Sequence, residues 1–600
     1  MLAGTTDTRA GDVTGVGHTG NVRIAIGPRD DGLIALVDPD APEQPLAAVP
    51  AGELPATVAR FERHESPRWV WSDTRQWYPK LLAAGVRVER CDDLLLAAAI
   101  LDHSTDTATV RERGAAAAPA WIARLRAGQL APAPAALGTA LFDFDDFDGD
   151  HGGAGAPGPS LDEVLAEDAR QRALTADSAR PRAMRLLLAA ESAGALIGAE
   201  LHAAGLPWSR EVHERVLETT LGPRPRPGAK PEHMERFAAA VRRELEAPGL
   251  NLDSQLEVLR ALRAAGIPVE STSRWELREH EHPAIEPLIA YKKLARLASA
   301  NGWAWLDEWI VDGRFRPDYV PGGTATGRWA TSGGGALQLP KLVRSAVVAD
   351  PGWRLVVADA AQLEPRVLAA LARDEAMADA ARGRDVYRGI VEAGVVEERD
   401  QAKIAVLGAM YGATTGDSGR LVPRLARAFP RAMALVDRAA AQGERGGSVT
   451  TNLGRSSPLP PASWREVQQR ASEPEASPAD ERRARSSARD WGRFTRNFVV
   501  QGSAAEWSLC WMAALRSRLA AMEPSASRAA ASGPVFEATP HLVYYLHDEI
   551  IVHTPAERAE EVAAAVAECA AEAGRLLFGD FPLDFPLDLA VVDSYALAEG

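Results

Sequence analysis

The chain has 600 residues, of which 46% are hydrophobic and 25% charged, proportions that are typical of folded globular proteins. This length exceeds what one hydrophobic core supports, so we expect roughly three or four domains. The net charge of -15 at pH 7 excludes a uniformly basic surface, so a nucleic-acid partner would need a local cluster of Lys and Arg. Its 3 cysteines are far apart, which argues against a disulfide framework or a zinc site and fits a reducing cytoplasm.

The N-terminus lacks the apolar segment of a signal peptide, and no stretch approaches the 18 or so apolar residues of a membrane span. We therefore predict a cytoplasmic protein with no membrane partner. Residues 1–20 are rich in Gly, Thr and Asp and are predicted to form a disordered tail.

A small α/β domain is predicted to follow this tail. VRIAIG and GLIALVD alternate like two strands of a hairpin, and WVWSD, RQWYPKLLAAG and RVERCDDLLLAAAIL continue the domain to about residue 135. The acidic, glycine-rich FDFDDFDGDHGGAGAPGPS then predicts a solvated linker. It does not match a calcium-binding loop, because the ligand positions of that loop do not align with its acidic residues.

The rest of the chain divides into a helical part and a part with strands. From about 180 to 310, patterns such as AMRLLLAAESAGALIGAELHAAG and HPAIEPLIAYKKLARLASANGWAWLDEW predict long helices. From about 345 to 600, the strands RLVVADA, LVYYLHDEIIVHT and LDLAVVDS bracket a large helical insertion, in which EPEASPADERRARSS is the most loop-like stretch. The expected architecture is a sheet interrupted by helices.

Two of these strand segments carry aspartate between apolar residues. RLVVADA runs into Asp359, and in LVYYLHDEIIVHT two strands flank His547, Asp548 and Glu549, which predicts a hairpin with the acidic pair at its tip. A lone aspartate of this kind is usually an ordinary turn residue. Two carboxylates on adjacent strands, however, are what phosphoryl transfer requires, because Mg²⁺ takes one or two carboxylates and fills its other sites with phosphate oxygen and water.

A basic helix is predicted between the two aspartates. In RDQAKIAVLGAMYG, Arg399, Lys403, Leu407 and Tyr411 recur every four residues and would form one slowly drifting stripe. From Lys403 to Tyr411 the helix would extend about 12 Å, roughly the length of a nucleotide from its phosphates to its base. Taken alone, the segment is better explained as an amphipathic helix with a basic edge.

Together these segments resemble the three polymerase motifs of family A DNA polymerases, the DNA polymerase I type. The first motif resembles residues 359–366, the second Arg399, Lys403, Tyr411 and Gly412, and the third residues 547–549. Further similarity covers TATGRWATSGGGALQLP, RFTRNFVVQGSAAEW and the helical segments after residue 250, so the resemblance extends over about residues 180–600.

The resemblance implies an α+β multidomain fold, in which a ribonuclease H-like (exonuclease-like) α/β domain precedes a right-hand polymerase. That polymerase would have a helical thumb, an antiparallel-sheet palm and helical fingers. The expected boundaries are residues 1–20 for the tail, 21–135 for the exonuclease-like domain, 136–180 for a linker, 181–345 for the thumb and the start of the palm, 346–375 for the palm with the first motif, 376–488 for the fingers and 489–600 for the palm with the third motif.

The implied activity is DNA-templated addition of dNMPs to a primer 3′ end, with release of pyrophosphate, in DNA repair or replication. By this resemblance, Asp359, the Ala360 carbonyl and Asp548 would hold two Mg²⁺ ions, for which Mn²⁺ could substitute. Lys403 would be a further catalytic residue that protonates pyrophosphate. The expected partners are primer–template DNA and dNTPs, and the chain is expected to be a monomer without a preceding 5′-nuclease domain.

The resemblance also assigns nucleotide and DNA contacts. Arg399 and Lys403 would grip the triphosphate, Glu364 would block a ribose 2′-hydroxyl, and Tyr411 would lie near the templating base. The implied nucleotide-binding residues are Arg399, Lys403, Gln362, Glu364, Leu407 and Tyr411. The implied DNA-binding residues are Arg328, Gln338, Arg493, Asn497, Gln501, His547 and Glu549.

The sequence departs from the family pattern at three positions. Leu407 replaces the aromatic residue four positions after the lysine of the second motif, which affects sugar handling and discrimination against dideoxynucleotides. Ala360 replaces a tyrosine, and Pro365 replaces a leucine and should cap or kink the start of the following helix. Because the metal and phosphate ligands are intact, activity is expected to persist.

Residues 21–135 resemble the 3′-5′ exonuclease domain of the same polymerases, but its DxE motif is missing. Only Asp93, with Asp73 as a second candidate, corresponds to an exonuclease carboxylate, whereas two-metal hydrolysis needs several. We therefore predict a degenerate exonuclease fold that supports the palm. The alternatives are a bifunctional polymerase with an active exonuclease, a non-catalytic DNA-binding scaffold, and a single-subunit RNA polymerase; Glu364 and Glu549 argue against the last.

Overall fold

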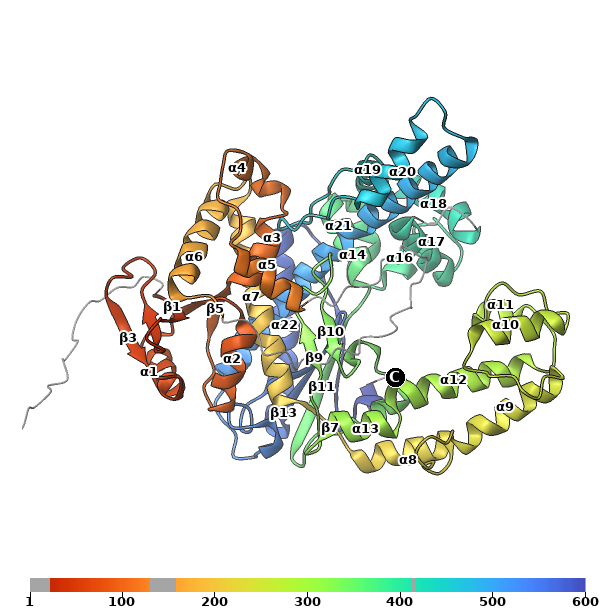
Figure 1. Ribbon diagram of the computed structural model, residues 1–600, viewed down its shortest axis with the longest axis horizontal. Helices are drawn as coiled ribbons and strands as arrows, with labels where there is room; N and C mark the ends of the chain where they lie inside the picture. Colours follow the sequence, from red (N-terminus) through yellow and green to blue (C-terminus); the bar gives the residue numbers. More distant parts are fainter. Residues whose placement is uncertain (1–21, 130–157, 413–415, 599–600) are drawn as a thin grey trace, which may run out of the picture.

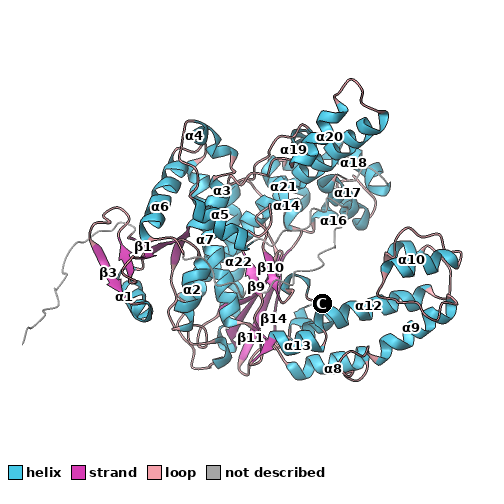
Figure 2. Cartoon of the chain, in the orientation of Figure 1, coloured by secondary structure: helices cyan, strands magenta, loops and turns pink. Residues whose placement is uncertain are grey.

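The computed structural model describes residues 22–129, 158–412 and 416–598. The predicted tail at residues 1–20 lies outside these ranges. Figure 1 shows an N-terminal α/β unit on one side, a central antiparallel sheet, a helical arm formed by α8–α13 and a helical lobe formed by α15–α20. The strands occur in the N-terminal unit and in the centre, as Figure 2 shows, whereas the arm and the lobe are helical.

The N-terminal unit is built on a mixed sheet of 5 strands in the order β3-β2-β1-β4-β5. β1 pairs antiparallel with β2, which confirms the predicted hairpin, and pairs parallel with β4. The strands are β1 (Arg23–Pro28), β2 (Ile34–Val37), β3 (Pro45–Val49), β4 (Arg68–Trp71) and β5 (Arg90–Asp93). The helices are α1 (Leu54–Glu65), α2 (Thr74–Ala83), α3 (Leu94–Leu101), α4 (Ala108–Glu112) and α5 (Ala120–Gln129).

Part of the predicted linker is a helix. Within residues 136–180, α6 (Leu161–Ala176) begins with a capping box formed by Ser160 and Glu163, which satisfies the free N–H groups of its first turn. Leu161 and Val164 lie in the hydrophobic core of the N-terminal unit, and Leu161 lies so close to Gly27 of β1 that a Cβ there would be 2.7 Å from its Cα. The linker prediction is therefore wrong for residues 161–176, which cover the N-terminal sheet, while most of the acidic stretch lies outside the described residues.

Helix α7 (Pro181–Ala204) is the predicted long helix after residue 180 and runs through the centre of the molecule. It contacts α2 and β5 of the N-terminal unit as well as α21 (Pro478–Ala520) and β12 of the central region. By length and composition, α7 is the one helix among the described residues that could span a membrane, but 61% of its most apolar window is buried inside the protein. Burial against protein on several sides explains its apolar sequence.

The helical arm projects from the central region (Figure 1). Short strands lie at its base: β6 (Leu206–Pro207), β7 (Ile310–Val311) and β8 (Arg314–Phe315) form one small sheet, and β9 (Asp318–Val320) pairs with β10 (Ala330–Gly333). The helices of the arm are α8 (Arg210–Leu221), α9 (Glu232–Glu244), α10 (Gln255–Ala264), α11 (Arg274–Arg278), α12 (Ile285–Asn301) and α13 (Trp303–Trp309).

The central sheet has 4 strands in the order β12-β13-β11-β14, and all neighbouring pairs are antiparallel. Its strands are β11 (Trp353–Ala360), β12 (His541–Leu546), β13 (Glu549–Pro555) and β14 (Leu587–Val592), and α22 (Ala559–Phe578) packs against it. The chain leaves the sheet after β11 and returns only at β12, which confirms the prediction of a sheet interrupted by helices.

The helical insertion contains the lobe and a very long helix. Its members are α14 (Leu363–Ala372), α15 (Glu375–Ala381), α16 (Val386–Glu392), α17 (Arg399–Tyr411), α18 (Gly416–Ala428), α19 (Pro430–Glu444), α20 (Ala462–Ala471) and α21. The loop-like prediction for EPEASPADERRARSS is wrong after Ser477, where a capping box starts the 43 residues of α21. This helix crosses the expected boundary at residue 488, because its C-terminal half is buried against α7 and α22 and continues the exposed N-terminal half.

Candidate active site

Asp359 and Asp548 lie together at one end of the central sheet. Asp359 is the second-to-last residue of strand β11, and Asp548 is in the two-residue turn that joins β12 to β13, the strand paired with β11. The backbone N–H of Ala360 donates a hydrogen bond to the Asp548 carbonyl at 3.0 Å. The preceding His547 adopts a left-handed backbone with φ 58°, which suits a tight hairpin turn. The structure thus confirms the predicted hairpin.

The two carboxylates oppose each other electrostatically. Burial and the nearby charge of Asp359 raise the pKa of Asp548 to about 7. Burial and the charge of Asp588, the cross-strand neighbour on β14, raise the pKa of Asp359, while Arg344 lowers it. Burial and neighbouring carboxylates therefore raise the pKa of both aspartates, and a bound cation would favour their ionised forms.

Three of the predicted residues, from three separate segments, converge beside this pair. Glu364 in the first turn of α14 forms an ion pair with Arg328, and its second oxygen accepts a hydrogen bond of 2.8 Å from the hydroxyl of Tyr411 at the end of α17. Burial and the negative charge of Glu364 raise the pKa of Tyr411, so its hydroxyl stays protonated and donates. The segment before β11, the start of α14 and the end of α17 therefore meet at one carboxylate.

Helix α17 presents the predicted stripe. Lys403 is exposed, Leu407 is half-buried, and Arg399 in the first turn lies 2.7 Å from an oxygen of Asp385 and stacks over the ring of Tyr387. Asp385 and Tyr387 flank the start of α16 and were not identified from the sequence. Their only sequence signal is the Asp before a short helix, which is a common cap.

Gln362 connects the first motif to α16. It adopts a left-handed backbone before α14, and its side-chain oxygen accepts a hydrogen bond of 3.3 Å from the Val386 N–H. Pro365 occupies the third position of α14, where the missing N–H would have had no helical partner. Pro365 is therefore accommodated at the start of the helix, as the sequence indicated.

The remaining predicted DNA-binding residues lie in different surroundings. Arg493 contacts the end of α17, since a Cβ on Gly412 would be 2.8 Å from its Cγ. Asn497 has a buried side-chain oxygen without a partner among the described residues, and Gln501 follows on the same helix. Gln338 is exposed in a short turn near the arm. Their contacts with DNA stay predictions.

Glu549 and His547 flank Asp548 but differ in their exposure to solvent. Glu549 is 9% exposed and accepts a hydrogen bond of 2.6 Å from Tyr595, with Arg344 3.8 Å away. Although His547 has an exposed surface, partial burial of its imidazole and the charge of Arg328 lower its pKa. Arg344 and Tyr595 therefore belong to the surroundings of the site, although they were not identified from the sequence, because they lie outside the three motifs.

Asp93 and Asp73, the two candidate exonuclease carboxylates, act as helix caps. Asp93 accepts hydrogen bonds from Thr74 and Leu96 at 2.8 and 3.0 Å, and Asp73 accepts one from Arg75. Burial and the charge of Asp73 raise the pKa of Asp93 to about 6. Among the described residues, no group of three or more His, Cys, Asp or Glu side chains that could hold a metal ion is found.

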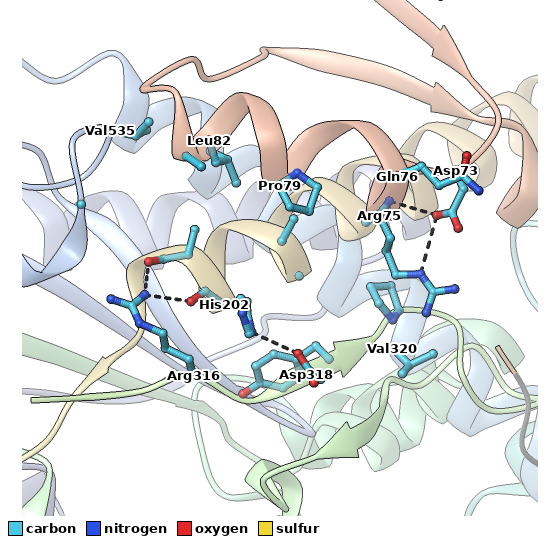
Figure 3. Close-up of a pocket in the computed structure, with 18 of the residues that line it drawn as sticks. Asp73, Arg75, Gln76, Pro79, Leu82, His202, Arg316, Asp318, Val320 and Val535 are labelled. Atoms are coloured by element: carbon cyan, nitrogen blue, oxygen red, sulfur yellow. Dashed lines mark hydrogen bonds and ion pairs between the residues drawn. The ribbon is translucent and has the colours of Figure 1, made fainter. Parts of the chain in front are cut away.

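Asp73 and Asp93 also line a cavity of about 730 Å³ between the N-terminal unit and the central region. Figure 3 shows Asp73 beside Arg75 at one end of the cavity and Val535 at the other, with Pro79 and Leu82 of α2 between them. His202 of α7 lies beside Asp318, with 3.1 Å between the paired atoms. Apolar residues of the loop at 533–536 also line the cavity. The cavity is distinct from the Asp359–Asp548 site.

Comparison with solved structures defines the class of fold. The chain is similar to the POL domain of Pol1 from M. smegmatis, solved in complex with a DNA primer-template and dNTP, with a TM-score of 0.62, 17% identity and coverage of 96% of both chains. The architecture is thus a mixed α+β multidomain fold of the polymerase-domain type. The sequence model for DNA polymerase family A matches residues 252–592. The chain belongs to family A of the DNA polymerases.

Individual relatives agree with this assignment. The chain is 28% identical over 402 residues to the thermostable DNA polymerase I of Thermus filiformis, covering 60% of this chain and 43% of that protein. Against the Thermus aquaticus enzyme it is 27% identical over 404 residues, with the same coverages of 60% and 43%. The chain thus spans less than half the length of these two curated relatives.

Proposed function

We propose that this chain is a DNA-templated DNA polymerase that adds dNMPs to a primer 3′ end and releases pyrophosphate. The observation that carries the proposal is the pair Asp359 and Asp548, brought together from positions far apart in the chain at one end of an antiparallel sheet in a family A fold. In this assignment, the central sheet is the palm, the helical arm is the thumb and the helical lobe is the fingers.

The donor set suits two Mg²⁺ ions. Asp359, Asp548 and the Ala360 carbonyl offer hard oxygen ligands at one end of the sheet, and the raised pKa values of the two carboxylates, caused by burial and neighbouring negative charges, support a cation between them. Two carboxylates would suffice for Mg²⁺, because this ion keeps waters and phosphate oxygens as its other ligands. When bound, such ions would activate the primer 3′-oxygen and stabilise the leaving pyrophosphate.

The surrounding residues have separate tasks. Arg399 and Lys403 lie one turn apart on α17 and would bind the triphosphate, with Lys403 placed to give a proton to pyrophosphate. The Glu364 carboxylate, fixed by Arg328 and Tyr411, would exclude a ribose 2′-hydroxyl by its bulk and charge. A fixed carboxylate excludes a ribonucleotide better than a mobile one. The 2′-hydroxyl could displace the Glu364 side chain only by breaking its bonds to Arg328 and Tyr411.

The N-terminal unit is proposed to be a ribonuclease H-like, exonuclease-like domain without hydrolytic activity. Its strand order and directions, with the antiparallel strands β3, β2 and β1 next to the parallel strands β1, β4 and β5, support this proposal. Asp93 and Asp73 are engaged as caps of α3 and α2, and two-metal hydrolysis needs more carboxylates than these two. The unit would then serve the polymerase by supporting it.

Primer extension tests the proposal. Purified protein with Mg²⁺, a labelled primer–template and either dNTPs or rNTPs should extend the primer with dNTPs only. Extension with rNTPs alone would favour an RNA polymerase, and DNA binding without extension would favour a scaffold. A second assay omits the nucleotides. If the wild type then shortens the primer from its 3′ end and the Asp93→Ala variant does not, the N-terminal unit is an active exonuclease.

A further inference from the structure

A loop between α19 and α20, residues 449–457, is fixed to α21. It folds back on itself through an antiparallel bridge between Thr450 and Ser456. The Asn452 N–H donates to the hydroxyl of Ser503, and the Leu453 N–H donates to the Glu506 carboxylate, both at 2.9 Å. The loop is therefore held to the long helix by backbone as well as side-chain bonds.

The N-terminal unit binds the outer side of the same loop. The Ser104 hydroxyl donates to the Gly454 carbonyl at 2.6 Å, and the Thr105 N–H donates to the Ser456 hydroxyl at 2.9 Å. Arg180, just before α7, bridges Asp106 at 2.9 Å and the Asn452 carbonyl at 2.7 Å. The three contacts with the loop itself join residues more than 250 positions apart, so they clamp the loop between two parts of the molecule.

Arg455 extends from the loop into the interior. It is 8% exposed and forms an ion pair with Glu191 of α7, which is 1% exposed. The turn at residues 321–328 lies against both partners. A Cβ on Gly327 would be 2.5 Å from the Arg455 Nε, and a Cβ on Gly322 would be 3.1 Å from a Glu191 oxygen. Both glycines have positive φ, 84° and 63°, so the turn approaches the ion pair with its backbone.

The next residue of this turn reaches the active site. Arg328 follows Gly327, and its carbonyl accepts a hydrogen bond of 3.1 Å from the Thr324 N–H, which closes the turn. Its guanidinium pairs with Glu364, the carboxylate that also binds Tyr411. A continuous set of contacts thus runs from the N-terminal unit through the loop and the buried ion pair to the side chains beside Asp548.

We propose that Arg455 and Glu191 are positioning residues that seat the turn carrying Arg328, and that the N-terminal unit keeps Arg455 in place by clamping its loop. The proposal rests on the proposed polymerase function, in which Arg328 holds primer–template DNA. It gives the N-terminal unit a task in DNA binding that does not depend on nuclease chemistry.

The test compares Arg455→Met with Arg455→Lys. Fluorescence anisotropy measures the affinity for a labelled primer–template without nucleotide, and steady-state extension separates kcat from the KM for dNTP. Arg455→Met should weaken primer–template binding roughly 10-fold or more, the size expected when one charge-assisted contact is lost. Arg455→Lys, which keeps the charge, should recover part of the affinity. The double variant Ser104→Ala, Thr450→Val removes two clamp contacts, the bond from Ser104 to Gly454 and a 2.7 Å bond between the hydroxyls of Thr105 and Thr450. It does not touch the buried pair and should weaken binding roughly 3-fold.

Arg314→Met is the matched control, because it breaks another buried ion pair, with Asp350. The hydrogen bonds of Arg314 go to Gly313, Asp350 and Ser532, outside the turn at 321–328 and the N-terminal unit. This variant should lower stability and leave primer–template affinity unchanged. The proposal is overturned if Arg455→Met binds DNA like the wild type, or loses no more affinity than Arg314→Met. If Arg455→Met does not fold, the same comparison is made with Arg455→Lys and the clamp variant. A wild type that binds DNA but does not extend it would refute the proposed function and leave the binding comparison intact.

Discussion

A buried charge cluster joins the N-terminal unit to the polymerase region, and its removal should be costly. Glu200 of α7 accepts hydrogen bonds from Arg516 of α21 at 2.6 and 3.0 Å and from Arg87 at 2.9 and 3.1 Å. The Tyr78 hydroxyl donates to the same carboxylate at 2.5 Å. The Glu200 and Arg516 side chains are only 6% and 4% exposed, so water cannot replace a lost partner.

Two independent arguments give the size of the effect of Glu200→Gln. Removing one partner of a buried ion pair leaves an uncompensated charge, which costs about 3–5 kcal/mol. Burial alone would raise the pKa of Glu200, but Arg516 and Arg87 outweigh it and lower the pKa to about 2, a shift worth about 3 kcal/mol at neutral pH. We therefore expect Glu200→Gln to lower the free energy of unfolding by about 3 kcal/mol or more.

Urea unfolding at pH 7, followed by tryptophan fluorescence, measures this loss. Glu568→Gln is the control, because its partner Arg518 lies two residues from Arg516 on α21 and the pair is 46% and 63% exposed; it should cost less than about 1 kcal/mol. Since the folded pKa of Glu200 is depressed, its contribution is complete above pH 4.5 and lost as the pH falls toward 2. Similar losses in the two variants, or an unchanged acid profile in Glu200→Gln, would refute the reasoning.

Three further predictions follow from the site and the core. Glu364→Ala should improve rNTP use relative to dNTP use roughly 10- to 100-fold, measured as the ratio of kcat/KM values; an unchanged ratio would contradict the role of Glu364. Burial lowers the pKa of His541 to about 4, so folding stability should fall, by up to about 3 kcal/mol, as the pH drops from 6.5 toward 4, and His541→Phe should flatten this part of the urea-denaturation profile. Gly412→Ala should destabilise the protein by about 1–2 kcal/mol in the same assay, because Gly412 has φ 73° and a Cβ there would lie 2.8 Å from the Arg493 Cγ; full stability would show that this contact relaxes freely.

The sequence predicted the parts of the fold whose signals are local. Alternating apolar residues identified the β1–β2 hairpin and the β12–β13 hairpin, and the spacing of Arg399, Lys403, Leu407 and Tyr411 identified α17. Predictions from local sequence patterns were wrong where tertiary contacts determine the secondary structure. Residues 161–176 were predicted to be part of a linker because the preceding sequence is acidic and glycine-rich. In the structure, however, Leu161 and Val164 are buried against the N-terminal sheet.

For the same reason, only some residues of the candidate site could be predicted from the sequence. Motif residues such as Asp359 and Asp548 carry a recognisable pattern along the chain. Arg344, Asp385, Tyr387 and Tyr595 contact those motifs only after folding, so no local pattern marks them. The Arg455–Glu191 pair is a further example, since its partners lie 264 positions apart.

The central claim is that Asp359 and Asp548 together support DNA synthesis. The most direct measurement is single-nucleotide incorporation by the purified wild type, Asp548→Asn and Asp359→Asn with Mg²⁺, alongside primer–template binding by anisotropy. We expect each substitution to lower incorporation by about 1,000-fold or more, equivalent to about 4 kcal/mol of transition-state stabilisation, while DNA binding is retained. Incorporation by either variant at close to the wild-type rate would contradict it.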